Sequence, residues 1–357
     1  MMDPETPGSP ETRVSVALCA GVVVAGGALR FALAWSAPES VDLQSYDIVA
    51  DLLRRGLPLY EGTHRYNYAP LWAWILDAIH RAARFSSVSP AGLTRSLLAA
   101  GDLACAWMAF RLARRKGFVH PWAAAAAVAG NPVLIWVSSV QGQFDNLSIL
   151  LLLVALDAAT VLRATPALFL SLAVKQVTAV HPLLFLRRRE DVLPILSVYA
   201  GTAALFLPYA SQWRAIRDHV LLYRAVPRSY GLSELVLWDA RFALPVALIA
   251  LAAATAAAWR LRFAEPARAS LFVFLVLLAL APGLGSQYFV WPLVVGALFR
   301  GPGYILVTIA ALVWVLGSHF GVPGSGQFFG QILWLAVAFW TLREARVLFP
   351  PQPARVS

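Results

Sequence analysis

The stretch Val41–Trp74 reads VDLQSYDIVADLLRRGLPLYEGTHRYNYAPLWAW and follows the first long apolar segment of the chain. Its aspartates, arginines and tyrosines make it too polar to cross a bilayer. Within it, Asp42–Arg55 sets apolar side chains beside acidic and basic ones, which predicts an amphipathic helix on the membrane surface that ends at Gly56. Pro70 predicts the start of a second helix, Leu71–Phe85, with its tryptophans at the depth of the interface.

Most of the remaining residues are apolar. The chain has 357 residues, of which 59% are hydrophobic and 13% are charged, about half the charged fraction of an ordinary soluble domain. Repeated apolar runs of about 20 residues, rich in alanine and leucine, predict an all-α polytopic membrane protein rather than a barrel. We expect one transmembrane domain at 14–347, between a disordered N-terminus at 1–13 and a tail at 348–357.

About ten full transmembrane helices are expected from the apolar runs. They are 14–35, 93–112, 121–140, 146–162, 192–210, 242–259, 269–284, 289–299, 304–318 and 329–342. A further apolar segment, 166–186, is either a crossing or a hairpin. If it crossed, Arg187–Arg189 and all later basic loops would lie outside, against the positive-inside rule. Because Lys175 lies near its midpoint and Pro182 can break it, we predict a hairpin with Lys175 near the tip.

This topology places both termini in the cytoplasm. The two longest polar loops, 36–90 and 211–239, then face the non-cytoplasmic side together with the short turns at 141–146, 286–288 and 318–326. One face of the membrane therefore collects the polar stretches that can carry chemistry.

The net charge of +10 has two interpretations. In a soluble protein it would indicate nucleic-acid binding. Here the arginines gather in short loops between apolar runs, which indicates membrane orientation and attraction to anionic lipids, and excludes nucleic acid as the expected partner. Cys19 and Cys105 both lie in apolar runs, so we expect free thiols and no disulfide framework.

Asp42 is the first candidate for catalysis. A carboxylate at the membrane interface can act as a general base, which typically contributes about 10²–10⁴-fold to a rate. Asp42 also precedes a helical pattern, so a cap of that helix is an equal alternative. Asp47 and Asp51 suit the solvated face of the same helix, with Asp47 kept as a candidate acceptor-binding residue.

Lys175 and Gln176 lie in the middle of an apolar run. A charge there costs roughly 2.5–3.5 kcal/mol on insertion scales, which makes Lys175 a functional candidate. A phosphate partner would offset that cost. The alternative is an internal ion pair with an acid such as Asp145.

Other polar residues of the outer face form hydrogen-bonding sets suited to a sugar or a phosphate. Arginines bind phosphate through paired N–H donors, and the candidates are Arg65, Arg224 and Arg228. The candidate sugar- or acceptor-binding residues are His64, Tyr66, Asn67, Tyr68, Gln141, Gln143, Asp145, Asn146, Gln176, Gln287 and Tyr288. For these the alternatives are headgroup contacts, an interfacial tyrosine belt and a capped helix start at Asp145 or Asn146.

Four motifs together resemble a known superfamily. They are Asp42…Tyr46…Gly56-x-x-x-Tyr60; Arg65-Tyr-Asn-Tyr-Ala-Pro70-Leu-Trp-Ala-Trp74; Gly142-Gln-Phe-Asp-Asn146 followed by Lys175-Gln176; and Gln287-Tyr-Phe-Val-Trp291-Pro292. In order and spacing the chain resembles the C superfamily (GT-C fold) of integral-membrane glycosyltransferases. It is most similar to mannosyltransferases that use polyprenol-phosphate mannose, of glycosyltransferase family 87 and of the catalytic-subunit type of the first GPI mannosyltransferase.

The resemblance implies an inverting sugar transfer from a polyprenyl-phosphate donor to a lipid or glycan acceptor. Matched by position, Asp42 would be the base, and Arg65, Lys175 and an arginine of 211–239 would hold the phosphate. The GPI-type enzymes have Asp-x-Asp at this loop start, whereas Ser40 stands two residues before Asp42 here. That departure leaves a divalent metal possible but unassigned, and no other cofactor is expected.

Other sequence features bear on the alternatives. The sequence has no P-loop, no GxGxxG after a strand, no HExxH and no CxxC, which disfavours a nucleotide-sugar donor or a zinc site. A lipid or small-solute transporter would also explain many spans and Lys175, but we find no internal repeat. A glycan polymerase or ligase and an inactive scaffold subunit are further alternatives. The composition favours a bacterial inner membrane over the endoplasmic reticulum.

Overall fold

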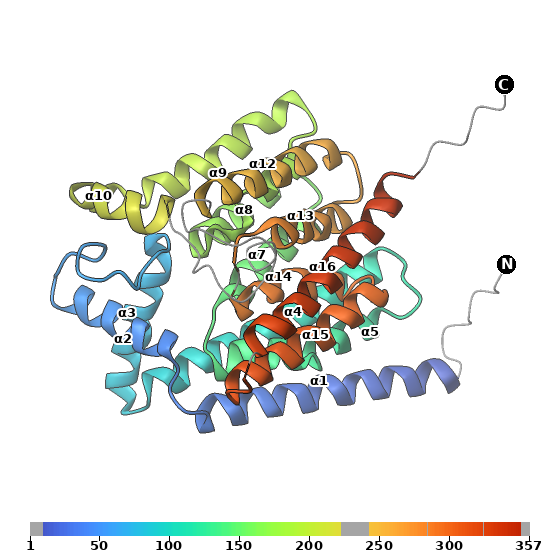
Figure 1. Cartoon of the computed structure of the whole chain (residues 1–357), viewed down its shortest axis with the longest axis horizontal. Coiled ribbons are helices and arrows are strands. Elements are labelled where there is room, and N and C mark those ends of the chain that lie inside the picture. Colours follow the sequence, from blue (N-terminus) through green and yellow to red (C-terminus); the bar gives the residue numbers. More distant parts are fainter. Residues whose placement is uncertain (1–9, 223–242, 284, 324, 351–357) are drawn as a thin grey trace.

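The computed structural model describes residues 10–222, 243–283, 285–323 and 325–350. Within these ranges every regular element is a helix. The helices lie against one another in one bundle, with α2, α3 and α10 together at one side of it (Figure 1). The all-α prediction is confirmed for this part of the chain.

Helices occur in each expected apolar segment of the described ranges, but several are shorter than expected, and the span expected at 192–210 is broken after Ala204, where the axis bends by 57° before Leu207. The α-helices are α1 (Pro10–Ser36), α2 (Val41–Arg54), α3 (Pro70–Ser86), α4 (Pro90–Arg115), α5 (Pro121–Ala129), α6 (Pro132–Ile135), α7 (Asp145–Asp157), α8 (Val161–Val174), α9 (Val192–Ala204), α10 (Trp213–Ile216), α12 (Ala243–Leu261), α13 (Pro266–Leu280), α14 (Val290–Gly296), α15 (Pro302–His319) and α16 (Ser325–Leu348). Tighter or wider turns join them: the π-helices η1 (Trp136–Val140) and η6 (Arg217–Leu221), and the 3₁₀ helices η2 (Gln176–Thr178), η3 (His181–Phe185), η4 (Arg189–Asp191), η5 (Leu207–Gln212) and η8 (Ser286–Phe289).

Several of these helices are apolar enough to span a membrane. Among the described residues, four pass by length and composition, and up to six if each of two bent pairs counts as one span. The four are Val16–Ser36, Pro90–Arg115, Leu244–Leu261 and Pro302–His319. The chain is therefore a polytopic helical protein of membrane-spanning composition, and the number of about ten crossings stays a prediction.

The span expected at 121–140 is not one straight helix. It is broken between α5 and α6, where the axis bends by 44°. The bend falls at Gly130-Asn131-Pro132, where Pro132 cannot donate a backbone hydrogen bond and Asn131 caps the new helix by accepting from the backbone N–H groups of Val133 and Leu134.

The bundle has a basic end, formed by the loops at 111–120, 157–163, 187–191 and 260–268. Three contacts join these loops: Arg115 with Asp157, Lys116 with Glu265, and Arg187 with the carbonyl oxygen of Ala264. The segment 161–186 therefore starts and finishes at the same end. Its helix α8 stops at Val174, Lys175 is extended (φ −153°, ψ 130°), and two 3₁₀ turns lead back. The predicted hairpin with Lys175 near its tip is what the fold contains.

The opposite, polar end is formed by the loops at 36–69, 141–144, 205–222 and 285–289. Hydrogen bonds join them: Arg95 to the carbonyl oxygens of Ala37, Pro38 and Val140; Ser40 to that of Gln141; Ser286 to the Gln141 side chain; and the Tyr60 backbone N–H to the Gln212 side chain. The described parts of four of the five polar stretches that were expected to share one face therefore meet at one end of the bundle. For the turn at 318–326 the expectation stays a prediction, and residues 223–239 lie outside the described ranges.

Helix α2 was expected to be amphipathic and to lie on the membrane surface. Its apolar face (Leu43, Tyr46, Val49 and Ala50) is buried in the protein. That face packs with α3 and with Phe144, whose ring stacks on Trp72 at a centroid distance of 4.1 Å. The amphipathic pattern is confirmed, and most of its apolar face packs on the bundle, whereas Ile48 is exposed. The position of α2 at the membrane surface stays a prediction.

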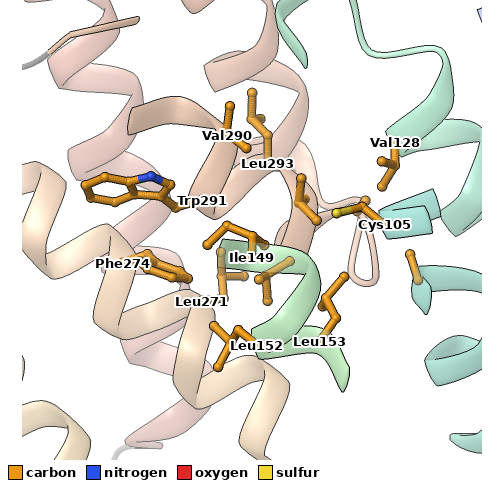
Figure 2. Close-up of a cluster of buried hydrophobic side chains, with 14 of the residues drawn as sticks. Cys105, Val128, Ile149, Leu152, Leu153, Leu271, Phe274, Val290, Trp291 and Leu293 are labelled. Atoms are coloured by element: carbon orange, nitrogen blue, oxygen red, sulfur yellow. The ribbon is translucent and has the colours of Figure 1, made fainter. Parts of the chain in front are cut away.

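The main core lies between α4, α7, α13 and α14. Figure 2 shows Cys105, Ile149, Leu271 and Trp291 converging there from four helices. Trp291 lies at the margin of this core, packed on Phe274 with a centroid distance of 5.7 Å. Its indole N–H donates a hydrogen bond to Asp145 at the start of α7, toward the polar end.

Candidate active site

Asp42 lies in the first turn of α2 and is half-buried. The cap of this helix is Ser40, whose hydroxyl accepts from the backbone N–H of Leu43 and donates to the carbonyl oxygen of Gln141 at 2.6 Å. The alternative that Asp42 is the helix cap is therefore wrong. Its carboxylate remains available for other work.

The surroundings of Asp42 raise its pKa above the ordinary value. Burial is the main cause, because it disfavours the charged carboxylate. A hydrogen bond from the Gln143 side chain and the positive charge of Lys175 oppose the rise, and the negative charge of Asp145 adds to it. A carboxylate with a raised pKa is a stronger base than an ordinary surface aspartate.

A buried ion pair lies beside it. The ammonium group of Lys175 contacts Asp145 Oδ2 at 2.5 Å, and the two side chains are 3% and 0% exposed. Trp291 Nε1 donates to the other carboxylate oxygen of Asp145 at 2.7 Å. The ammonium also lies over the rings of Phe144 and Tyr68, at 4.6 and 5.0 Å from their centroids. The internal pair weighed from the sequence is thus present.

The broken backbone of the hairpin puts Lys175 in this place. Helix α8 is held against α7 by Ser148 and Ser171, each of which donates to the backbone carbonyl oxygen of the other, at 2.9 and 2.7 Å. The chain leaves the helix at Lys175, so its side chain is directed from the end of α8 toward the start of α7. Asp145 stands at that start.

Two glutamine side chains near the pair have unused hydrogen-bonding capacity. Gln176 Nε2 donates to the carbonyl oxygen of Asn67 at 2.7 Å, and Gln143 bonds Asp42. The Oε1 atoms of both glutamines are buried and have no partner among the described residues. A buried acceptor without a partner is costly, and a hydroxyl-rich ligand would satisfy both.

Gly142 lets this segment approach α2. It has φ +77°, and a Cβ atom there would lie 3.0 Å from the side chain of Leu43. A larger residue would be strained in φ and crowded against α2. The glycine therefore fixes Gln143 beside Asp42.

The other candidates at 64–68 are used in different ways. Tyr66 bonds within its own loop, donating to the carbonyl oxygen of Ala69 and accepting from the N–H of Ala73. His64 contacts His219 of η6, with 2.9 Å between Nδ1 and Nε2. Arg65 is exposed. Only Asn67 and Tyr68 of this set lie against the Lys175–Gln176 segment.

Two further predicted residues lie away from Asp42. Asp47 is exposed on another face of α2 and pairs with His80 at 3.2 Å. The side-chain nitrogen of Asn146 donates to Asp102 at 2.7 Å and to the carbonyl oxygen of Leu98 at 2.6 Å, inside the bundle. Both residues thus have partners within the protein, although Asn146 Oδ1 is buried without a partner among the described residues. Their predicted roles in sugar or acceptor binding stay predictions.

The remaining candidates flank the ion pair or lie outside the described residues. Gln141 accepts a hydrogen bond from Ser286, and the ring of Tyr288 lies 4.7 Å from that of Trp291. Gln287 is half-buried in η8. The predicted phosphate ligands Arg224 and Arg228 lie outside the described ranges.

Sequence reasoning missed a second buried ion pair. Arg30 of α1 and Asp102 of α4 are 0% and 1% exposed, with Nε 2.8 Å from Oδ2. Ser138 and Asn146 donate to the same carboxylate. The rule that marked Lys175, a charge inside an apolar run, would have found both residues had it been applied to the first and second spans.

No candidate metal site emerges: among the described residues, no three His, Cys, Asp or Glu side chains gather in a way that could hold an ion. Comparison with known proteins adds no assignment, because no protein-family model and no curated protein matches the chain. The likeness to the C superfamily rests on the quoted motifs.

Proposed function

We propose that the chain is an inverting glycosyltransferase that moves a sugar, with mannose favoured, from a polyprenyl-phosphate donor to a hydroxyl of a lipid or glycan acceptor. The observation that carries the proposal is the half-buried Asp42, its pKa raised, held by Gln143 next to the buried pair of Lys175 and Asp145. This places a base, a buried cation and unpaired amide oxygens at one end of an apolar bundle. The sequence motifs supply the substrate class.

In the proposed reaction Asp42 takes the proton of the acceptor hydroxyl. The oxygen attacks the anomeric carbon, the bond from that carbon to the phosphate oxygen breaks, and polyprenyl phosphate leaves with the electron pair. The configuration at the anomeric carbon is thereby inverted. Negative charge grows on the phosphate as it leaves, so fixed positive charge nearby lowers the barrier.

Lys175 is proposed to act on that charge while paired. Its partner Asp145 offsets much of the positive charge. Trp291 donates a hydrogen bond to the second oxygen of Asp145 and so stabilises part of the negative charge on that oxygen, away from Lys175. The exposed Arg65 would bind the phosphate directly, as would Arg224 and Arg228. Gln143, Gln176, Asn67 and Tyr68 would contact the sugar or the acceptor.

The proposed setting is a bacterial inner membrane with the polar end outside. The endoplasmic reticulum is less favoured. The chain would cross about ten times if α8 turned back and each of the following segments crossed once: α1, α4, the bent segment α5–α6–η1, α7, α9, α12, α13, α14, α15 and α16. The start of α1 and the end of α16 lie on the same side of the bundle, as an even number of crossings requires (Figure 1).

The test is sugar transfer by the purified chain in lipid, from radiolabelled polyprenyl-phosphate mannose to a membrane extract, comparing Asp42→Asn with Asp47→Asn. The two substitutions make the same chemical change in one helix, but only Asp42 faces Gln143 and Lys175. We expect Asp42→Asn to lower transfer by about 10²–10⁴-fold with donor binding kept, and Asp47→Asn to leave it nearly unchanged. Equal loss in both variants would contradict the role of Asp42.

A transporter is the second candidate, because a buried ion pair such as Lys175–Asp145 also occurs in transport pathways. The same preparation distinguishes the two. Sealed vesicles that move polyprenyl-phosphate sugar across the bilayer without a new glycosidic product would support the transporter. A labelled product with a new glycosidic bond would support the transferase.

A further inference from the structure

The basic end of the bundle carries an amphiphilic groove remote from Asp42. A hollow of about 700 Å³ lies between the start of α1, the end of α4 and the start of α5. Its walls include Leu18, Phe110 and Trp122, with Arg114 and His120 as the polar residues. A second hollow of about 550 Å³ continues along α1 and shares Leu18 with the first.

Arg114 is the unpaired member of a basic cluster. Its neighbours Arg111 and Arg115 both pair with Asp157, and Lys116 pairs with Glu265. Arg114 is exposed, and no acid of the described residues lies within ion-pair distance of it. The cation that lines the groove therefore retains its capacity to bind an anion.

The second hollow is almost wholly apolar. It is lined by one face of α1, formed by Ala17, Leu18, Gly21, Val22 and Ala25, all of them exposed. A Cβ atom added at Gly21 would meet nothing within 4 Å, so the groove is open at that point. The two hollows together thus form an amphipathic groove: a part lined by Arg114 and aromatic side chains opens onto a shallow apolar face of α1.

We propose that this groove binds an anionic phospholipid, with the phosphate at Arg114 and one acyl chain along α1 over Gly21. The charge selects the class, because a zwitterionic lipid brings no net negative charge to the unpaired guanidinium. An exposed apolar helix face next to an unpaired guanidinium fits a ligand that has both an anionic group and an acyl chain, and a free phosphate lacks the acyl chain. The inference requires a membrane around the bundle but does not depend on the proposed sugar transfer.

The test uses the full chain in phosphatidylcholine nanodiscs that contain a small fraction of brominated lipid, which quenches tryptophan on contact. The signal of Trp122 is isolated as the difference between the unmodified chain and Trp122→Phe. We expect brominated phosphatidylglycerol to quench Trp122 more than brominated phosphatidylcholine at the same fraction. Arg114→Gln should lower the affinity for the anionic lipid about fivefold, the value of roughly one basic residue near a membrane surface.

Two further variants control for charge and for shape. Arg163→Gln removes an exposed arginine of the same end outside the groove and should keep the preference for the anionic lipid. Gly21→Leu fills the apolar hollow on α1. It should weaken the quenching of Trp122 by both lipids while keeping the ratio of quenching by the anionic lipid to quenching by phosphatidylcholine. Equal quenching by the two lipids in the unmodified chain, or an equal loss of preference in Arg114→Gln and Arg163→Gln, would overturn the proposal.

Discussion

The two buried ion pairs of the bundle differ in how completely their hydrogen bonds are used. Around Arg30 and Asp102, the guanidinium also donates to the backbone carbonyl oxygens of Gly26, Val128 and Ala129, and the carboxylate is bonded on both oxygens. Around Lys175 and Asp145, the carboxylate is also bonded on both oxygens, but the ammonium has only this one carboxylate partner and two aromatic faces.

Amide oxygens without a partner among the described residues lie beside both pairs, and the one beside Arg30 and Asp102 is Asn146 Oδ1. Two amide oxygens near Lys175, those of Gln143 and Gln176, are buried without a partner among the described residues, and Asp42 stands within electrostatic reach. A saturated pair holds helices in place, whereas an unsaturated pair at the polar end has capacity left for a ligand. Burial of charge alone therefore does not identify a site. The Lys175 pair is distinguished by an ammonium with a single hydrogen-bond acceptor and by a second carboxylate, Asp42, within electrostatic reach.

The largest expected effect follows from removing one charge of the saturated pair. Asp102→Asn leaves the guanidinium of Arg30 buried without a counter-charge, which typically costs about 3–5 kcal/mol. We expect the chain to unfold at a much lower mole fraction of SDS in mixed micelles. The rate of sugar transfer per folded molecule should be preserved. The double variant Arg30→Met with Asp102→Asn should recover much of the loss, because it removes both charges. Unchanged SDS resistance in Asp102→Asn would show that this pair does not hold α1 to α4.

Removing both charges of the Lys175–Asp145 pair should lower the rate of sugar transfer and not the stability of the fold. Lys175→Met with Asp145→Asn removes both charges but leaves an amide oxygen to accept from Trp291. We expect SDS resistance close to that of the unmodified chain and a fall in transfer of about 10²–10³-fold, as for loss of one group that stabilises developing charge. Transfer that persisted would mean that both pairs are structural and that the comparison fails.

A smaller effect should appear in the pH dependence of transfer. Transfer needs the ionised form of Asp42, so the rate should be constant above the raised pKa and fall as the pH drops through it. Gln143→Leu removes a hydrogen bond that lowers this pKa, so the pKa should rise further and the rate should begin to fall at a higher pH. Gln141→Leu, which changes an amide bonded to Ser286, serves as the control. Identical pH profiles in the two variants would show that Gln143 does not lower the pKa of Asp42.

Much of the fold followed from local patterns. Pro70 marked the start of α3, the alternation in 42–55 marked α2, and the positions of the arginines indicated the hairpin at Lys175. These features depend on neighbouring residues or on charge counting, which a sequence displays directly.

The partners of long-range contacts could not be predicted in the same way. Asp145 was marked for sugar binding and as one candidate partner of Lys175, but the sequence could not choose between these roles. The apolar face of α2 was assigned to lipid because lipid and protein present the same apolar chemistry to a helix. Arg30 and Asp102 are 72 residues apart, and only the packing of α1 on α4 brings them together.

That separation has a consequence for how the chain is made. The ribosome delivers Arg30 before Asp102, so for that interval an α1 helix inserted in the membrane would carry a charge without its counter-charge. If α1 and α4 both cross the membrane, as proposed, we expect their integration to be coupled, because the charge of the earlier helix is neutralised only when the later helix packs against it.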